Sequence, residues 1–174
     1  MKLMNDFFEN KLNECNIKRY LPSNNSLANY LPFLLSNNFV FISGQLPMTK
    51  NGIESPGKIR KEIVLSEYKK VMEITTSNLV WNLNDCIKDA VKKFTEVKCC
   101  SIKGYFNCDQ EFESHSALLN FTSDCIIKVL GINGRHSRVA IGVSSLPKNS
   151  PVEIEGIFSI WYIKYKENWT NSYY

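Results

Sequence analysis

Apolar and polar residues alternate along two stretches near the end of the chain. In residues 138–144, three β-branched residues alternate with an arginine, an alanine and a glycine, which predicts a strand with one apolar face. Residues 152–163 begin Val-Glu-Ile-Glu and then become apolar on both faces, which predicts a long strand covered on both sides. Residues 146–151, Leu-Pro-Lys-Asn-Ser-Pro, are of the types that are typical of turns. We therefore expect two strands joined by a short turn.

The same patterns predict the elements that precede these strands. A hairpin is expected where two apolar runs flank Ser-Asn-Asn, and helices where apolar residues recur at helical spacing. A stretch rich in β-branched and aromatic residues predicts a further strand. The expected elements are an N-terminal helix within 3–15, strands at 33–35 and 39–43, a helix at 66–81 closed by the polar residues 82–85, a strand at 97–108 and a helix at 112–130 capped by Gly131.

This order, β-β-α-β-α-β-β, predicts a single α+β domain with a mixed sheet and two helices on one face. The other face of the sheet must then be solvated or covered by a partner. The apolar side chains on both faces of residues 152–163 favour an oligomer.

Composition narrows the possible functions. The 174 residues carry 21 Lys and Arg against 17 Asp and Glu, a net charge of +4, and the basic residues are scattered. Scattered charge of this size does not indicate nucleic-acid binding. No apolar segment is long enough to cross a membrane, and acidic residues interrupt the N-terminus before a signal-peptide core forms. We therefore expect a cytoplasmic protein with no membrane partner.

The six cysteines form no Cys-x-x-Cys pair, and the chain has only two histidines. This pattern does not favour a metal site, and the cysteines are interpreted as small buried hydrophobic residues. His115 and His136 have no evident partner in the sequence, so we expect neither to act as a base.

Two charged residues stand out on the C-terminal strands. Arg138 begins the first strand and Glu153 lies near the start of the second. If the strands pair, both side chains reach one end of one face. A guanidinium can bind a carboxylate through two hydrogen bonds, and a nearby glutamate can hold and polarise a water molecule. An ordinary cross-strand salt bridge explains the same spacing.

The residues around this pair resemble a signature of the Rid (reactive intermediate deaminase) family, also labelled endoribonuclease L-PSP or translation inhibitor-like. The matching residues are Arg138, Leu146-Pro147 and the Val-Glu-Ile-Glu run at 152–155. A second block matches upstream, Asn29-Tyr30 and then Val-Phe-Ile-Ser-Gly-Gln-Leu-Pro at 40–47. The Gly-Arg-His lead-in at 134–136 indicates the branch that carries a Gly-Arg-His-x-Arg motif.

The resemblance divides the chain into an N-terminal extension (1–28), a Rid-like domain (29–163) and a C-terminal tail (164–174). It implies a chorismate mutase-like fold and a homotrimer with ligand clefts between subunits. It also implies that Arg138 anchors a substrate carboxylate and that Glu153 positions the attacking water. Four further positions match the family pocket as substrate-binding residues: Tyr30, Ser43, Gly44 and Asn120.

Each of these positions also has a structural explanation. Tyr30 can be a packing aromatic, Gly44 a bulge or strand end, and Asn120 a helix-surface residue. The chain departs from the deaminase pattern at Ala140, where cysteine is usual, and at Gly142, where an acidic residue is common. Both changes widen the expected pocket.

The implied reaction is hydrolysis of a 2-imino acid, formed from its enamine tautomer, to a 2-oxo acid and ammonia, with no metal or organic cofactor. Orientation of the acid and a placed base are sufficient for such reactive substrates. Two alternatives remain at the level of sequence. One is a non-catalytic protein that binds small carboxylates on the same trimeric scaffold, and the other is an RNA-acting protein, which the scattered charge disfavours.

Overall fold

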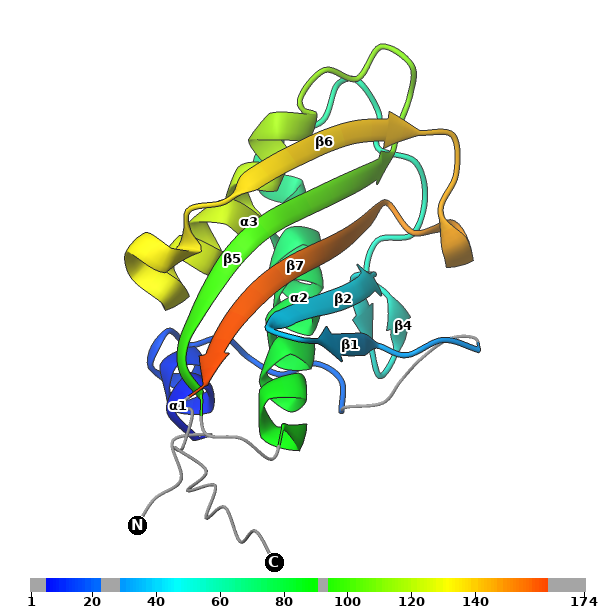
Figure 1. The fold of residues 1–174 in the computed structure, drawn as a ribbon. Helices are drawn as coiled ribbons and strands as arrows, with labels where there is room; N and C mark the ends of the chain where they lie inside the picture. Colours follow the sequence, from blue (N-terminus) through cyan, green and yellow to red (C-terminus); the bar gives the residue numbers. More distant parts are fainter. Residues whose placement is uncertain (1–5, 23–28, 91–93, 163–174) are drawn as a thin grey trace, which may run out of the picture.

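A five-stranded mixed sheet forms the centre of the fold in the computed structural model, which describes residues 6–22, 29–90 and 94–162 (Figure 1). The strand order is β1-β2-β7-β5-β6. Only β5 and β6 pair in parallel, and the other neighbours are antiparallel. The bounds are β1 (Phe33–Ser36), β2 (Phe39–Gln45), β5 (Phe94–Asn107), β6 (Ser137–Val143) and β7 (Val152–Tyr162).

Two long helices, α2 (Lys69–Asp89) and α3 (His115–Leu130), lie behind this sheet on the same face (Figure 1). The short helix α1 (Asp6–Glu14) packs beside α2 and buries Phe8 and Leu12. The remaining elements are a small hairpin of β3 (Met48–Thr49) and β4 (Gly52–Ile53) and three 3-10 turns: η1 (Leu65–Tyr68), η2 (Gly131–Gly134) and η3 (Pro147–Asn149).

Burial alternates along the central strands and fixes which side chains face the helices. On β7 the residues at 152, 154, 156, 158 and 160 are buried, and on β5 those at 102, 104 and 106 are buried. Because successive strand residues point to opposite faces, these positions form the core between the sheet and the helices. The intervening residues, Glu153 and Tyr105 among them, therefore point to the open face.

Several apolar side chains on the open face are exposed to solvent. Exposed hydrophobic residues occur on its outer strands at Leu34, Phe39, Phe41, Val139 and Ile141, and Trp161 on β7 is also exposed. Those on the outer strands lie toward the two edges of the sheet, on either side of the Lys103–Glu155 ion pair of the central strands.

The predicted fold class is confirmed: this is a single α+β domain with two helices on one face of a mixed sheet and the expected order of main elements. The helix expected at 66–81 instead spans Lys69–Asp89 and continues through the polar residues 82–85. The helix expected from 112 begins at His115. Residues 3–5, Ile163 and the tail 164–174, which entered the predictions, lie outside the described residues.

The expected pairing of the two C-terminal strands is wrong. β6 and β7 do not contact each other in the sheet, because β5 lies between them and pairs with both. The connection through η3 therefore steps over one strand. Within the described ranges, no helix combines the length and hydrophobicity that crossing a bilayer requires.

Candidate functional site

Arg138 lies on β6, at one edge of the sheet, and faces the helices. It is aligned with the buried Ile102 of β5. Its Nη1 donates to Ser123 Oγ at 3.0 Å and its Nη2 donates to the Ser116 carbonyl at 3.5 Å, both on α3. A guanidinium has five N–H groups, so three remain free of partners in the described part of the chain. Arg138 is exposed, so these three can reach a ligand.

Asn120 lies on the same stripe of α3 as these two partners. It is four residues after Ser116 and three before Ser123, and residues at this spacing are neighbours on a helix surface. Its side chain is exposed. Asn120 thus lies on the stripe of α3 to which Arg138 bonds, and we call Arg138, Asn120 and Ser123 the Arg138 half-site.

Both histidines have partners, contrary to expectation. The Nε2 atom of His136 lies 3.1 Å from Ser123 Oγ, and its Nδ1 lies 2.6 Å from the Gly134 carbonyl oxygen. His115 Nε2 lies 3.3 Å from the thiol of Cys108. Burial and then the charge of Asp109 raise the pKa of that thiol, which disfavours a reactive thiolate.

The free cysteines of the described residues otherwise fit the predicted role as small hydrophobic groups. Cys86, Cys99 and Cys108 are buried, and the others are half-buried. Burial raises the pKa of Cys86 to about 12 and that of Cys125 to about 11. Thiols of this kind stay protonated at neutral pH.

Glu153 lies on β7 opposite Tyr105, on the open face of the sheet. It is half-buried, and its carboxylate has neither a hydrogen bond nor an ion pair to any residue that the structure describes. The neighbouring Glu155 is bonded to Lys103 at 2.6 Å. Burial, and then the negative charge of Glu155, raise the pKa of Glu153. An unpaired carboxyl group in this state is typical of a group that exchanges protons.

Gly44 makes room for the Glu153 side chain. A Cβ at Gly44 would lie 1.7 Å from Glu153 Oε1, so a larger residue there would displace the carboxylate. The register of β2 against β7 shifts between Ile42 and Gln45, which places a β-bulge at Ser43 and Gly44. The structural explanation of Gly44 as a bulge is therefore correct, and the bulge also brings the backbone against Glu153.

Ser43 fixes the segment that carries Tyr30. Its hydroxyl donates to the Leu31 carbonyl at 2.7 Å and its amide donates to the Pro32 carbonyl at 3.1 Å. Tyr30 is exposed and lines a recess that also includes Gly44. The recess is lined by α2 residues such as Asn78 and Asn82, and Glu153 is not among its lining residues. Gly44 borders both the recess and Glu153, so we call Tyr30, Ser43, Gly44 and Glu153 the Glu153 half-site.

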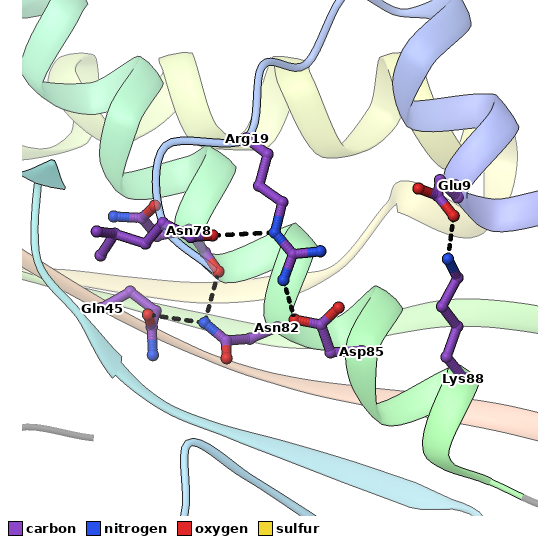
Figure 2. A network of polar contacts seen from close by, with 8 residues as sticks. Glu9, Arg19, Gln45, Asn78, Asn82, Asp85 and Lys88 are labelled. Atoms are coloured by element: carbon purple, nitrogen blue, oxygen red, sulfur yellow. Dashed lines mark hydrogen bonds and ion pairs between the residues drawn. The ribbon is translucent and has the colours of Figure 1, made fainter. Parts of the chain in front are cut away.

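The N-terminal segment forms one wall of this recess, which the sequence did not indicate. Arg19 Nη2 bonds to Asp85 Oδ2 at 2.6 Å (Figure 2). The guanidinium also lies 5.0 Å above the Trp81 ring. On the same helix, Asn82 donates to Gln45 Oε1 at 3.0 Å, which links α2 to β2 (Figure 2). Glu9 of α1 pairs with Lys88 further along α2 (Figure 2).

The two half-sites lie apart within one chain. Arg138 and Glu153 are two strands and three residue positions apart, on the order of 14 Å for ordinary strand spacings, and they point to opposite faces. A direct salt bridge between them is therefore excluded. A small acid held by Arg138 also cannot contact Glu153 of the same chain.

Comparisons with known proteins agree with this fold. The Agrobacterium tumefaciens protein Atu1372, of unknown function, shares 30% identity, with 90% of this chain and 96% of that chain covered and a TM-score of 0.72. A candidate endoribonuclease from Shewanella oneidensis has a TM-score of 0.74 at 21% identity, covering 87% and 98%. Escherichia coli TdcF, solved with bound serine, has a TM-score of 0.55 at 15% identity, covering 82% and 98%. No protein-family model matches the chain.

Proposed function

We propose that this chain, which belongs to the same family as Atu1372, is a Rid-like hydrolase. It deaminates reactive 2-imino and 2-enamino acids at a site shared between two copies. One observation carries the proposal. An exposed, partly free guanidinium and an unpaired, half-buried carboxyl group lie on opposite sides of one sheet. Among the described residues, Glu153 has no hydrogen-bond or ion-pair partner, and Arg138 hydrogen-bonds only to neutral oxygen atoms of Ser123 and Ser116.

A second copy can bring the two half-sites together. In a heterologous cyclic oligomer, one surface of a subunit lies against a different surface of the next, so Arg138 of one copy can face Glu153 of another. The apolar open face supplies the hydrophobic surface that such an assembly buries. The resemblance to the Rid family implies that the assembly is a homotrimer.

In this site Arg138 binds the substrate carboxylate through parallel N–H donors, and Asn120 and Tyr30 flank the ligand. Water held by Glu153 adds to the carbon of the C=N bond. Glu153 takes a proton from this water and returns it to the nitrogen, which gives a carbinolamine. The hydroxyl proton then passes through Glu153 to the nitrogen as the C=O bond forms and the C–N bond breaks, and the products are a 2-oxo acid and ammonia. A raised pKa of Glu153 suits a group that both accepts and donates this proton.

Two features support a small carboxylate as the ligand. TdcF, which shares the fold, was solved with serine bound, and serine carries such a carboxylate. In this chain Ala140 and Gly142 lie on the same face of β6 as Arg138, and Gly142 leaves space that the Cys108 thiol and the His115 ring occupy. These residues change the walls beside Arg138 and leave its guanidinium in place.

The direct test is release of ammonia and pyruvate from 2-aminoacrylate generated in the assay by a separate enzyme. We expect the Arg138→Ala variant to lose roughly 30-fold or more in kcat/KM, the usual effect of removing one partner of a desolvated charge pair. Arg138→Lys serves as the matched control, because it keeps the charge and removes the forked donors. Equal rates for the wild-type and Arg138→Ala proteins would contradict the proposal.

The departures at Ala140 and Gly142 favour one alternative, a protein that binds small carboxylates on this scaffold without turnover. Pyruvate binding that Arg138→Ala removes, with no acceleration of 2-aminoacrylate hydrolysis, would select it. The name of the Shewanella protein suggests a second alternative, RNA cleavage. RNA affinity that falls steeply with salt, together with cleavage, would select that one.

A further inference from the structure

We propose that His136 and Ser123 are positioning residues that set the direction of the Arg138 guanidinium. They form a chain of hydrogen bonds that runs from the Gly134 carbonyl through His136 and Ser123 to Arg138, with lengths of 2.6, 3.1 and 3.0 Å. The inference rests on the proposed role of Arg138 as the carboxylate anchor. It explains why the chain carries Gly134, His136 and Arg138 at alternate positions.

The Gly134 carbonyl, the first member of this series of hydrogen bonds, determines which atom donates and which accepts in each of the others. A carbonyl oxygen only accepts, so Nδ1 of His136 must carry the hydrogen. In the neutral ring Nε2 is then an acceptor, and the Ser123 hydroxyl donates to it. The hydroxyl oxygen of Ser123 is left with its lone pairs for the Nη1 donor of Arg138.

The two hydrogen-bond partners of the His136 ring, Gly134 and Ser123, are both held by α3. Gly134 packs so closely on this helix that a Cβ would lie 2.6 Å from Ile127 Cα and 2.7 Å from the Ile126 carbonyl oxygen. Ser123 is buried on the same helix. The His136 ring is therefore fixed between two points of one rigid element, and it transmits that rigidity to an exposed arginine side chain.

Among the residues that the structure describes, loss of the Ser123 hydroxyl leaves Arg138 with only the 3.5 Å hydrogen bond to the Ser116 carbonyl. The guanidinium then samples several rotamers, and binding a carboxylate must order it again. Ordering one long side chain lowers affinity by roughly 3- to 15-fold. The structure thus predicts a weaker Kd or a higher KM for Ser123→Ala, with kcat within about twofold of wild type, because the reacting groups are unchanged.

The experiment combines two readouts on full-length Ser123→Ala, Ser123→Thr and Ser137→Ala proteins. The first is the ¹⁵N order parameter of Arg138 Nε, measured without ligand. The second is the Kd for pyruvate together with KM and kcat for 2-aminoacrylate. Ser137→Ala is the matched control: the adjacent residue loses an identical hydroxyl, which donates instead to the Cys100 carbonyl.

We expect Ser123→Ala to lower the Arg138 order parameter and weaken binding, Ser123→Thr to restore both, and Ser137→Ala to change neither. In the wild-type protein, imidazole nitrogen shifts should place the hydrogen of His136 on Nδ1. An unchanged order parameter in Ser123→Ala, or a hydrogen on Nε2 alone, would overturn the inference. The order parameter, the imidazole nitrogen shifts and the pyruvate Kd need no turnover, so they separate failure of this inference from failure of the proposed function, which is decided by Arg138→Ala.

Discussion

At the scale of single residues, the position of the Glu153 carboxyl group depends on a glycine of the adjacent strand. Gly44 lies in a bulge of β2, and its missing side chain is the space that Glu153 Oε1 occupies. The sequence identified both residues through the resemblance. It did not indicate that they touch, because the contact depends on the bulge and on the pairing of β2 with β7.

Gly44→Ala is expected to lower turnover about 10- to 100-fold, because the new methyl group displaces the Glu153 carboxylate from its position. The displaced group is the end of a flexible side chain, so the free energy of unfolding should change by no more than about 1 kcal/mol. In a Glu153→Gln background the same substitution should have little further effect on turnover. Additive losses in the double variant would show that Gly44 acts independently of Glu153.

The ionisation of Glu153 should also affect stability. Its pKa is raised in the folded protein, by burial and then by Glu155, so the folded state holds this proton more tightly than the unfolded state. The contribution of this group to stability therefore falls as pH rises from the ordinary glutamate pKa through the raised one. Glu153→Gln removes that loss, so its gain in thermal midpoint over wild type should be larger at pH 8 than at pH 4. A gain that is larger at pH 4 would contradict the direction of the shift.

At the scale of elements, contacts between distant parts of the chain explain the features that local sequence patterns did not predict. Asn82 and Asp85 have weak helix propensity, and the sequence suggested that α2 ends near them. In the structure Asn82 bonds to Gln45 and Asp85 to Arg19, and the helix continues to Asp89. Similarly, the strand pattern of β6 and β7 was predicted correctly. Their separation by β5 was not, because strand order depends on contacts far apart in the chain.

Helix α2 also contains an unsatisfied buried amide. Asn84 is fully buried, and neither its Nδ2 nor its Oδ1 has a hydrogen-bond partner within the described residues. Replacing it by leucine should raise the free energy of unfolding by about 1 to 3 kcal/mol, since the cost of burying the amide is removed. Urea unfolding with an unchanged m-value measures this gain.

Asn107 provides the contrasting control for this substitution. It is also buried with an unpaired Oδ1, but its Nδ2 donates to the Ser150 carbonyl at 3.2 Å. Asn107→Leu should therefore be less stabilising than Asn84→Leu, because it breaks a bond and leaves a carbonyl unpaired. A loss of stability in Asn84→Leu would mean that its amide is satisfied in solution.

At the scale of the whole molecule, the proposed reaction requires an assembly of copies, because the two half-sites lie apart within one chain. The sequence indicated the residues of both half-sites except Ser123, and the structure places Arg138 and Glu153 on opposite faces of the sheet. Residue spacing carries no information on this separation, because it arises from the intervening strand β5. The exposed apolar residues of the open face, such as Phe41 and Ile141, provide the surface through which copies can meet.

The most direct test of a shared site is complementation between two inactive variants. Arg138→Ala and Glu153→Gln chains carrying different tags are co-expressed, and assemblies that contain both are purified. If each site takes its arginine from one copy and its glutamate from the next, every mixed assembly of the proposed homotrimer holds one wild-type site in three, so the purified mixed assemblies should regain about one third of the wild-type 2-aminoacrylate hydrolysis. Activity of the mixed assemblies that stays at the level of the two parent variants would contradict the shared site.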